Sequence, residues 1–403
     1  MRVWICLGLW ATTPAMADET LPKEGTITPL VQMQLWGTAF DQDEDPTAET
    51  VGYGDPGHDM GFSVRRLRLG FEGHRDAFDF QVDVGLSAPY DGLSGTGRPR
   101  FEVVNAFARG SWVVGQGVGR TSVGMVRVPF TRERLMSSRE LVFQERAVGT
   151  AWIAPSQDLG ILFDYELDMG VRAQVGVYNG GGDLFGDDNL GVLLAGRLEY
   201  ARGDTYRTYG ESDDVDVGVA VAGLWNQDVA TQTVGGEVDA LVRVWRVTLL
   251  AEVMTAFLQP GDSTVDMPGV ATPTQRLGIT GQLSWWTPLD AVEAPAAERS
   301  AVELAARVAT FNDNVGIGDN GDVLVLHSGA TWRNMAPGVD LGAGFIHREE
   351  MGGRTVPNDT VRLWGQVRWP ARPVRTTADS IIPSIPVPAN LPGEAEMHPT
   401  GNR

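Results

Sequence analysis

The stretch Val361-Arg362-Leu363-Trp364-Gly365-Gln366-Val367-Arg368-Trp369 alternates apolar and polar residues along almost its whole length. Successive side chains of a β-strand point to opposite faces, so the arginines of this segment share one face and its aliphatic residues share the other. Such a strand has water on the arginine side and hydrocarbon or a protein core on the aliphatic side. The segment is therefore predicted to be a strand with two unlike faces, and the same pattern recurs along the chain.

Sixteen segments are predicted as strands, and most have the length of about ten residues that a tilted strand needs to cross a bilayer. They lie near residues 28–40, 61–73, 77–87, 101–112, 120–130, 159–166, 170–179, 190–201, 214–225, 232–244, 246–258, 274–286, 299–311, 322–333, 338–348 and 359–369. Tight turns such as 167–168 alternate with long polar connections such as 88–100. This pattern, with an even strand count, is typical of outer-membrane barrels. We therefore predict an all-β fold, a transmembrane antiparallel β-barrel of 16 strands within residues 18–369.

Two features of the sequence bear on this architecture. The links 202–213 and 287–298 fall on the short-turn side of the predicted barrel, yet they are longer than the outer-membrane pattern prefers. A soluble β-sandwich or a β-solenoid also has alternating strands. However, a sandwich rarely carries so many charges in mid-strand, and the chain has no repeat of about 20 to 50 residues, which a solenoid requires.

The two ends of the chain differ in composition from the predicted barrel. Arg2 precedes the apolar stretch 3–10, and Ala15-Met16-Ala17 offers the small residues of a cleavage site. Residues 1–17 are therefore predicted to be a secretory signal peptide, which contains Cys6, the chain's single cysteine. Residues 370–403 are rich in proline and do not alternate, so they are predicted to be a disordered periplasmic tail.

The charge of the chain is strongly acidic, with 52 Asp and Glu against 32 Lys and Arg and a formal net charge of -20. Such a chain repels nucleic acid and has no basic patch for anionic lipid. Acidic residues are densest in the predicted loops, as in 41–49. A belt of aromatic residues at the membrane interface is predicted at strand ends, where Trp225, Trp245, Trp285, Trp332 and Trp369 fall.

Several motifs resemble a known family. Residues 62–73, FSVRRLRLGFEG, resemble the second strand of the phosphate-selective porin O/P family, and residues 123–133, VGMVRVPFTRE, resemble its fifth strand and the entry to its constriction loop. Residues 137–146 and 177–189 resemble the segments that follow. The resemblance implies a homotrimeric, 16-stranded outer-membrane channel that passes anions such as phosphate. It also implies arginine-lined walls and a third loop folded into the lumen.

Arginines are the candidate pore-lining and anion-binding residues. A guanidinium stays charged at any working pH and presents fixed donors to a phosphate or carboxylate. Arg66 and Arg68 share a face opposite Leu67 and Leu69, and Arg127 is also predicted to face the lumen. The full candidate set, which includes the arginines of the predicted constriction loop 131–158, is Arg66, Arg68, Arg127, Arg132, Arg134, Arg139 and Arg146. For each of them a structural salt bridge to a nearby Asp or Glu is the competing interpretation.

Other groups give weaker signals. Asp183, Asp187, Asp188 and Asn189, and likewise Asp313, Asn314, Asp319 and Asp322, lack an ordered calcium-ligand spacing and are interpreted as solvated loops. The five histidines show no zinc-ligand spacing, and no cofactor is predicted.

The sequence predicts a passive channel for small hydrophilic solutes, favouring anions such as phosphate, rather than an enzyme. A general pore for small anions, or one that favours cations, stays open, because the wall charges are close to balanced and acidic loops lie at the mouth. Two alternatives of other function classes also remain. One is a structural barrel that is tethered to the cell wall by its tail. The other is a hydrolase carried on a barrel, which would need a serine and a histidine on one rim.

Overall fold

The structure is a computed structural model that describes residues 25–42, 60–87, 100–182, 191–227, 231–261, 272–289, 299–318, 321–352 and 358–370. The predicted signal peptide, residues 1–17, lies outside the described residues, and so does the predicted tail apart from Pro370. Of the two acidic clusters, residues 183–189 and Asp319 also lie outside them.

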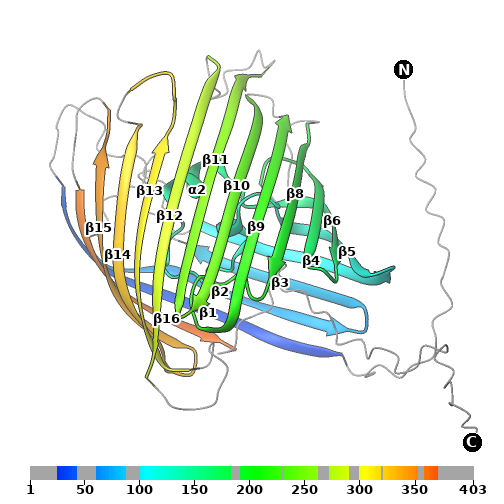
Figure 1. Cartoon of the computed structure of the whole chain (residues 1–403), viewed down its shortest axis with the longest axis horizontal. Helices are drawn as coiled ribbons and strands as arrows, with labels where there is room; N and C mark the ends of the chain where they lie inside the picture. Colours follow the sequence, from blue (N-terminus) through cyan, green and yellow to red (C-terminus); the bar gives the residue numbers. More distant parts are fainter. Residues whose placement is uncertain are drawn as a thin grey trace, which may run out of the picture.

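Sixteen antiparallel strands close into one barrel, in which each strand pairs with its neighbours in the chain and β1 pairs with β16 (Figure 1). The strands are β1 (Thr26–Gln42), β2 (Gly61–Arg75), β3 (Phe78–Ser87), β4 (Arg100–Val114), β5 (Gly117–Arg127), β6 (Gln157–Leu167), β7 (Val171–Tyr178), β8 (Leu193–Arg202), β9 (Ser212–Gln227), β10 (Thr231–Trp245), β11 (Val247–Pro260), β12 (Thr274–Pro288), β13 (Ala301–Asn312), β14 (Val323–Ala336), β15 (Val339–Glu350) and β16 (Asn358–Trp369). The predicted fold is confirmed.

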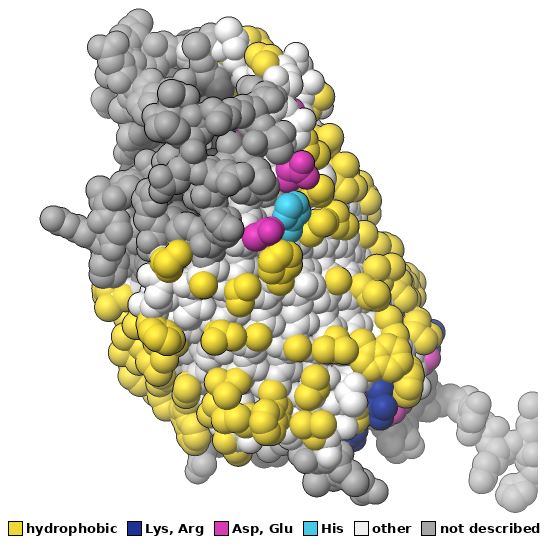
Figure 2. Space-filling view, turned by 90° about the vertical axis from the view of Figure 1, so that its left-hand side faces the viewer, with side chains coloured by type: hydrophobic (Ala, Val, Ile, Leu, Met, Phe, Trp, Pro, Cys, Tyr) yellow, Lys and Arg dark blue, Asp and Glu magenta, His cyan; other side chains and the backbone are white. Residues whose placement is uncertain are grey.

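The two faces of each strand meet different surroundings. In β16, Leu363 is 55% exposed on the outside, whereas Arg362 is 4% exposed and points inward. Apolar side chains cover much of the outer surface, and the charged side chains visible on it lie near its ends (Figure 2). Since a hydrocarbon layer offers no partner for charge, this arrangement suits a barrel in a bilayer. Among the residues that the structure describes, no helix is long and apolar enough to cross a membrane.

The strand boundaries agree with the prediction to within a few residues, with two informative differences. β5 ends at Arg127 rather than at residue 130, because Pro129 has no N–H to donate to the strand ladder. A register shift between Gln34 and Leu35 places a bulge in β2, so Arg65 and Arg66 are both buried. Strict alternation would have sent Arg65 outward, and this residue was missing from the predicted set.

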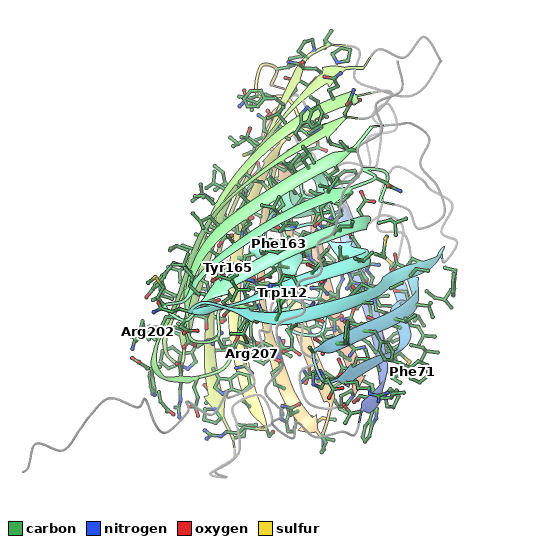
Figure 3. All side chains as sticks on the ribbon, turned by 90° about the vertical axis from the view of Figure 1, so that its right-hand side faces the viewer. Phe71, Trp112, Phe163, Tyr165, Arg202 and Arg207 are labelled. Carbon is green, nitrogen blue, oxygen red and sulfur yellow. The ribbon has the colours of Figure 1, made fainter. Side chains whose placement is uncertain are left out.

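The barrel has a turn end and a loop end. We call turn end the side where β2–β3, β4–β5, β6–β7 and β14–β15 are joined by tight turns, and loop end the opposite side. All five belt tryptophans predicted from the sequence are exposed on the outer surface, and Trp245 packs edge-to-face on Trp285 at 5.4 Å between ring centroids. Trp112, Phe163 and Tyr165 add to the aromatic surface towards the turn end (Figure 3). Aromatic rings at strand ends stabilise a barrel at the membrane interface.

Charge at the middle of the outer face is expected to destabilise the barrel. Val253 is exposed near the middle of β11, and Val244 is exposed at the turn end of β10. We expect Val253→Arg to cost about 2–4 kcal/mol of folding free energy in lipid and Val244→Arg to cost at most about 1 kcal/mol. Denaturant titration of folding into vesicles measures both; equal costs would contradict a bilayer around β11.

Candidate channel constriction

The connection between β5 and β6, residues 128–156, folds into the barrel; we call it the inner loop. Its flanking strands pair directly at Arg127 and Gln157, so the loop leaves and rejoins the wall at one place. Helix α1 (Arg132–Leu135) begins after Thr131, whose Oγ1 accepts the N–H of Arg134 at 3.2 Å. Helix α2 (Val148–Ile153) follows. The inner loop thus has its own short helices, which fix its path.

Side chains from distant parts of the wall hold the backbone of the inner loop. Each of these wall residues donates a hydrogen bond to a loop carbonyl oxygen, which satisfies a buried acceptor. The bonds are Arg66 to Gln144 O (2.7 Å), Arg197 to Phe130 O (2.9 Å), Arg307 to Glu145 O (2.9 Å), Arg333 to Leu141 O (2.9 Å) and Gln366 to Arg139 O (3.3 Å). Because these residues belong to β2, β8, β13, β14 and β16, the inner loop spans the lumen.

Close packing fixes α2 against the wall. A Cβ atom added to Gly149 would lie 2.9 Å from the Cα of Gly278 in β12, closer than real Cβ contacts come. Glycine at both positions therefore allows the helix backbone to approach the strand backbone directly. An apolar cluster that includes Val126, Val128 and Phe130 packs the base of the loop against β4, β6, β7 and β8.

Arg132 is the centre of a buried ion-pair network. Its Nε lies 2.7 Å from Asp239 and its Nη1 lies 2.7 Å from Glu199, and its side chain is 0% exposed. Arg197 contacts Glu237 at 3.2 Å and also Asp239, which extends the network across the wall. For Arg132 the salt-bridge interpretation is therefore the one that the contacts support.

The carboxylates Glu237, Asp239 and Glu252 lie close enough to one another to suggest a metal site. However, Arg197 contacts Glu237 and Asp239, and Glu252 accepts the N–H of Glu133 at 2.8 Å. The cations and donors of the protein thus already compensate this cluster, and we assign no metal to it.

Arg66 and its neighbour Arg65 share one carboxylate. Arg65 lies 2.6 Å and Arg66 lies 3.1 Å from Glu145 on the inner loop. Burial raises the pKa of the Glu145 carboxyl, but the two guanidiniums lower it further, to about 2. Glu145 therefore stays ionised at neutral pH and joins the inner loop to β2.

Arg127, Arg134 and Arg146 donate mainly to carbonyl oxygens of the inner loop. Arg134 bonds Ala154 O and Ala151 O, both at 3.2 Å, while Arg146 bonds Glu133 O at 3.1 Å and Met136 O at 3.0 Å. Arg127 donates to Leu135 O. Burial and the charge of Arg146 lower the pKa of Arg134 to about 9, which leaves it protonated at neutral pH. These cations order the loop and add positive charge to it.

Arg68 and Arg139 differ from the other candidates. Arg68 bonds Ser138 Oγ at 2.8 Å, but its nearest carboxylate, Glu102, is 3.8 Å away. Among the described residues, no carboxylate lies within ion-pair distance of Arg139. The buried donors Arg68 Nε and Arg139 Nη1 have no hydrogen-bond partner in the described part of the chain. Buried donors normally bind something. Arg132 also has a buried donor without a partner, but it already pairs with two carboxylates, so Arg68 and Arg139 are the candidate anion site.

The wall beside this candidate site carries mixed charge. Asp83 accepts Asn105 Nδ2 at 2.7 Å, and Arg109 donates to Ser122 at 3.1 Å. Nearer the turn end, Asp164 pairs with Arg172 and lies 3.3 Å from Arg120. Acids and arginines therefore alternate on this wall.

The histidines show how the barrel uses polar side chains outside the candidate site. His74 bonds Asp79, His347 bonds Asp359, and His327 lies 3.5 Å from Arg307 and stacks on Phe143. These contacts join strands or hold the inner loop, and they do not form the serine–histidine pair that a barrel-borne hydrolase would need.

The sequence and the fold resemble known proteins. Residues 42–216 match the family described as phosphate-selective porin O and P, which confirms the resemblance seen in the motifs. A search of curated proteins found no match.

Solved porin structures share the fold at low sequence identity. The anion-selective porin from Comamonas acidovorans is 12% identical, with 86% of this chain and 100% of that chain covered and a TM-score of 0.52. OprB of Pseudomonas putida is 10% identical, and the match covers 86% of this chain and 94% of OprB with a TM-score of 0.55. The outer membrane channel DcaP of Acinetobacter baumannii is 11% identical, with 88% and 100% covered and a TM-score of 0.51.

The Arg132 network is expected to dominate the stability of the inner loop. Arg132→Ala leaves Arg197 to compensate Asp239, Glu199 and Glu237 by itself. Buried negative charge is then uncompensated, so we expect a loss of about 3–5 kcal/mol of unfolding free energy. Urea unfolding in detergent measures this. Arg202 and Asp214 form an exposed ion pair near the turn end, so Arg202→Ala serves as the matched control and should leave stability unchanged. Equal behaviour of the two variants would contradict a structural role for Arg132.

Proposed function

We propose, on the premise of the family match over residues 42–216, that this protein is an outer-membrane porin. It forms a passive diffusion channel for small hydrophilic solutes and favours small anions such as phosphate. The match and the closed, apolar-surfaced barrel support the channel. The preference for anions rests on one observation about the guanidiniums of Arg68 and Arg139. Among the described residues, each has a buried donor without a partner and no carboxylate closer than 3.8 Å.

Charge and hydrogen bonding explain how this pair would select anions. An ion that enters a narrow lumen loses part of its hydration shell, and fixed donors replace those contacts. Phosphate offers several acceptor oxygens, and Arg68 and Arg139 present charged donors side by side, since Ser138 on the inner loop bonds Arg68 and precedes Arg139. A cation at this place would meet two positive charges. The other arginines of the loop hold the pair in place.

The two remaining candidate functions have less support. A structural barrel needs no buried guanidinium donors that lack partners, such as those of Arg68 and Arg139 among the described residues. The tail on which its tether depends lies outside the described residues. The family match and the fold point to a channel rather than to an enzyme.

Ion selectivity tests the proposal directly. In a planar bilayer under a potassium chloride gradient, we expect a zero-current potential on the chloride side and block of the chloride current by phosphate. Arg139→Ala should weaken the phosphate block by about ten- to a hundred-fold, because a hydrogen bond to a charged group contributes about 1.5–3 kcal/mol. Arg75, an exposed residue at the β2–β3 turn, gives the control variant Arg75→Ala, which should leave the block unchanged.

Two outcomes would count against this assignment. A zero-current potential on the potassium side would mean that acidic residues dominate the lumen. The proposed selectivity for anions would then be wrong. If Arg139→Ala leaves the phosphate block unchanged, Arg139 is not part of the anion site.

We further propose that the mature chain begins at Asp18 and assembles as a homotrimer, as the family resemblance implies. The face over β14–β16 and β1 carries small outward-facing residues on neighbouring strands, which would allow a second barrel to approach closely. They are Gly37, Ala330, Ala343 and Gly365. Native mass spectrometry of protein extracted from outer membranes should give three copies of a chain that lacks residues 1–17. A monomer would contradict the proposed trimer, and a chain that retains Met1 would contradict the proposed cleavage before Asp18.

A further inference from the structure

The connection between β8 and β9, residues 203–211, also folds into the lumen, from the turn end. We call it the floor loop. It is one of the two links that are too long for the outer-membrane pattern, and its inward path explains its length. Thr205, Tyr206, Thr208 and Tyr209 are all buried. A simple turn would have left them in water.

The floor loop follows the wall from β10 towards β16. Arg243 of β10 donates to Asp204 O at 2.9 Å, and Ser284 of β12 donates to Thr208 O at 2.8 Å. Tyr209 then reaches three further wall residues. Its ring stacks on Trp286 of β12 at 5.6 Å and lies 4.3 Å below the guanidinium of Arg333 of β14, and Arg368 of β16 donates to its hydroxyl at 3.3 Å.

The floor loop also contacts the inner loop directly. Arg132 donates to Thr205 O at 3.1 Å, the N–H of Val142 donates to Thr208 Oγ1 at 3.3 Å, and the hydroxyl of Tyr209 donates to Glu140. The two loops are therefore packed on each other over the β10–β16 side of the lumen. Buried charged and aromatic contacts of this kind have few alternative arrangements.

Open space lies on the β6–β8 side of the barrel. A pocket of 650 Å³ opens beside the β6–β7 turn and the end of β8, and Glu166, Arg172, Glu199 and Tyr206 are among its lining residues. It lies at the turn end, where Arg202 and Arg207 mark the rim in Figure 3. Arg68 lies on β2, outside the β10–β16 side, and residues 203–206 at the start of the floor loop form part of the lining of the pocket.

We infer that the floor loop is a second constriction element, which closes the β10–β16 side and directs solutes past Arg68 and Arg139 to an exit at the Glu166 pocket. This inference rests on the proposed channel function. Selectivity then depends on two loops from opposite ends of the barrel. The inner loop supplies Arg139 beside Arg68 of β2, and the floor loop ensures that a solute cannot bypass this pair.

Shortening the floor loop tests this role. Replacing residues 204–210 by Asn-Gly, a two-residue turn that suits a hairpin, should raise single-channel conductance and weaken block by phosphate. Unchanged conductance and block in a correctly folded variant would overturn the inference. Wild-type protein without any current would instead reject the proposed channel, so the two failures are distinguishable.

Cysteine labelling tests the exit without shortening the floor loop. It provides a result even if the shortened chain fails to fold. Glu166 and Glu211 are both ion-paired near the turn end, with side chains 20% and 17% exposed, but only Glu166 lines the pocket. Each is changed to cysteine in a Cys6-free chain and treated with an anionic methanethiosulfonate. Loss of current for Glu166→Cys but not for Glu211→Cys is expected; equal loss, or loss for Glu211→Cys alone, would overturn the route.

Discussion

Every backbone N–H and C=O group that lies in hydrocarbon must be bonded within the protein, and the rest of this structure depends on that constraint. The pairing of β1 with β16 meets it, because it removes the two free edges that an open sheet would present to lipid. Closure also forces the inward side chains of sixteen strands into one limited space. The outer face can then be apolar throughout its middle, and all charge carried by the strands must be accommodated inside.

The packing of that inner space explains why most lumen arginines are not free to bind solutes. Arg132, Arg197 and Arg333 each contact more than one carboxylate, since a buried cation without such partners would be strongly destabilising. The same residues donate to the carbonyl oxygens of the inner and floor loops. The charge network therefore builds the constriction. Arg68 and Arg139 differ from it because no carboxylate of the described residues lies closer than 3.8 Å to either of them.

A channel built in this way combines a rigid frame with a small selective element. The frame is closed, and its charges are close to balanced along the wall. The selective element that we propose is the pair Arg68 and Arg139, placed by loop residues such as Ser138. An acidic overall charge of -20 is compatible with anion passage, because buried ion pairs cancel locally and the field at a constriction comes from its nearest unpaired groups.

The sequence by itself determined the strands, because a two-residue alternation is a local property that survives in any register. It also placed Arg66 and Arg68 on the lumen face and located the constriction loop. Three things were decided only by tertiary structure. Arg65 turns inward because of a bulge in the pairing of β2 with β1. Residues 203–211 fold inward because Tyr209 finds partners on β12, β14 and β16. Arg132 is ion-paired because Asp239 and Glu199 lie beside it. Each depends on groups far apart in the chain, and only closure of the barrel brings them together.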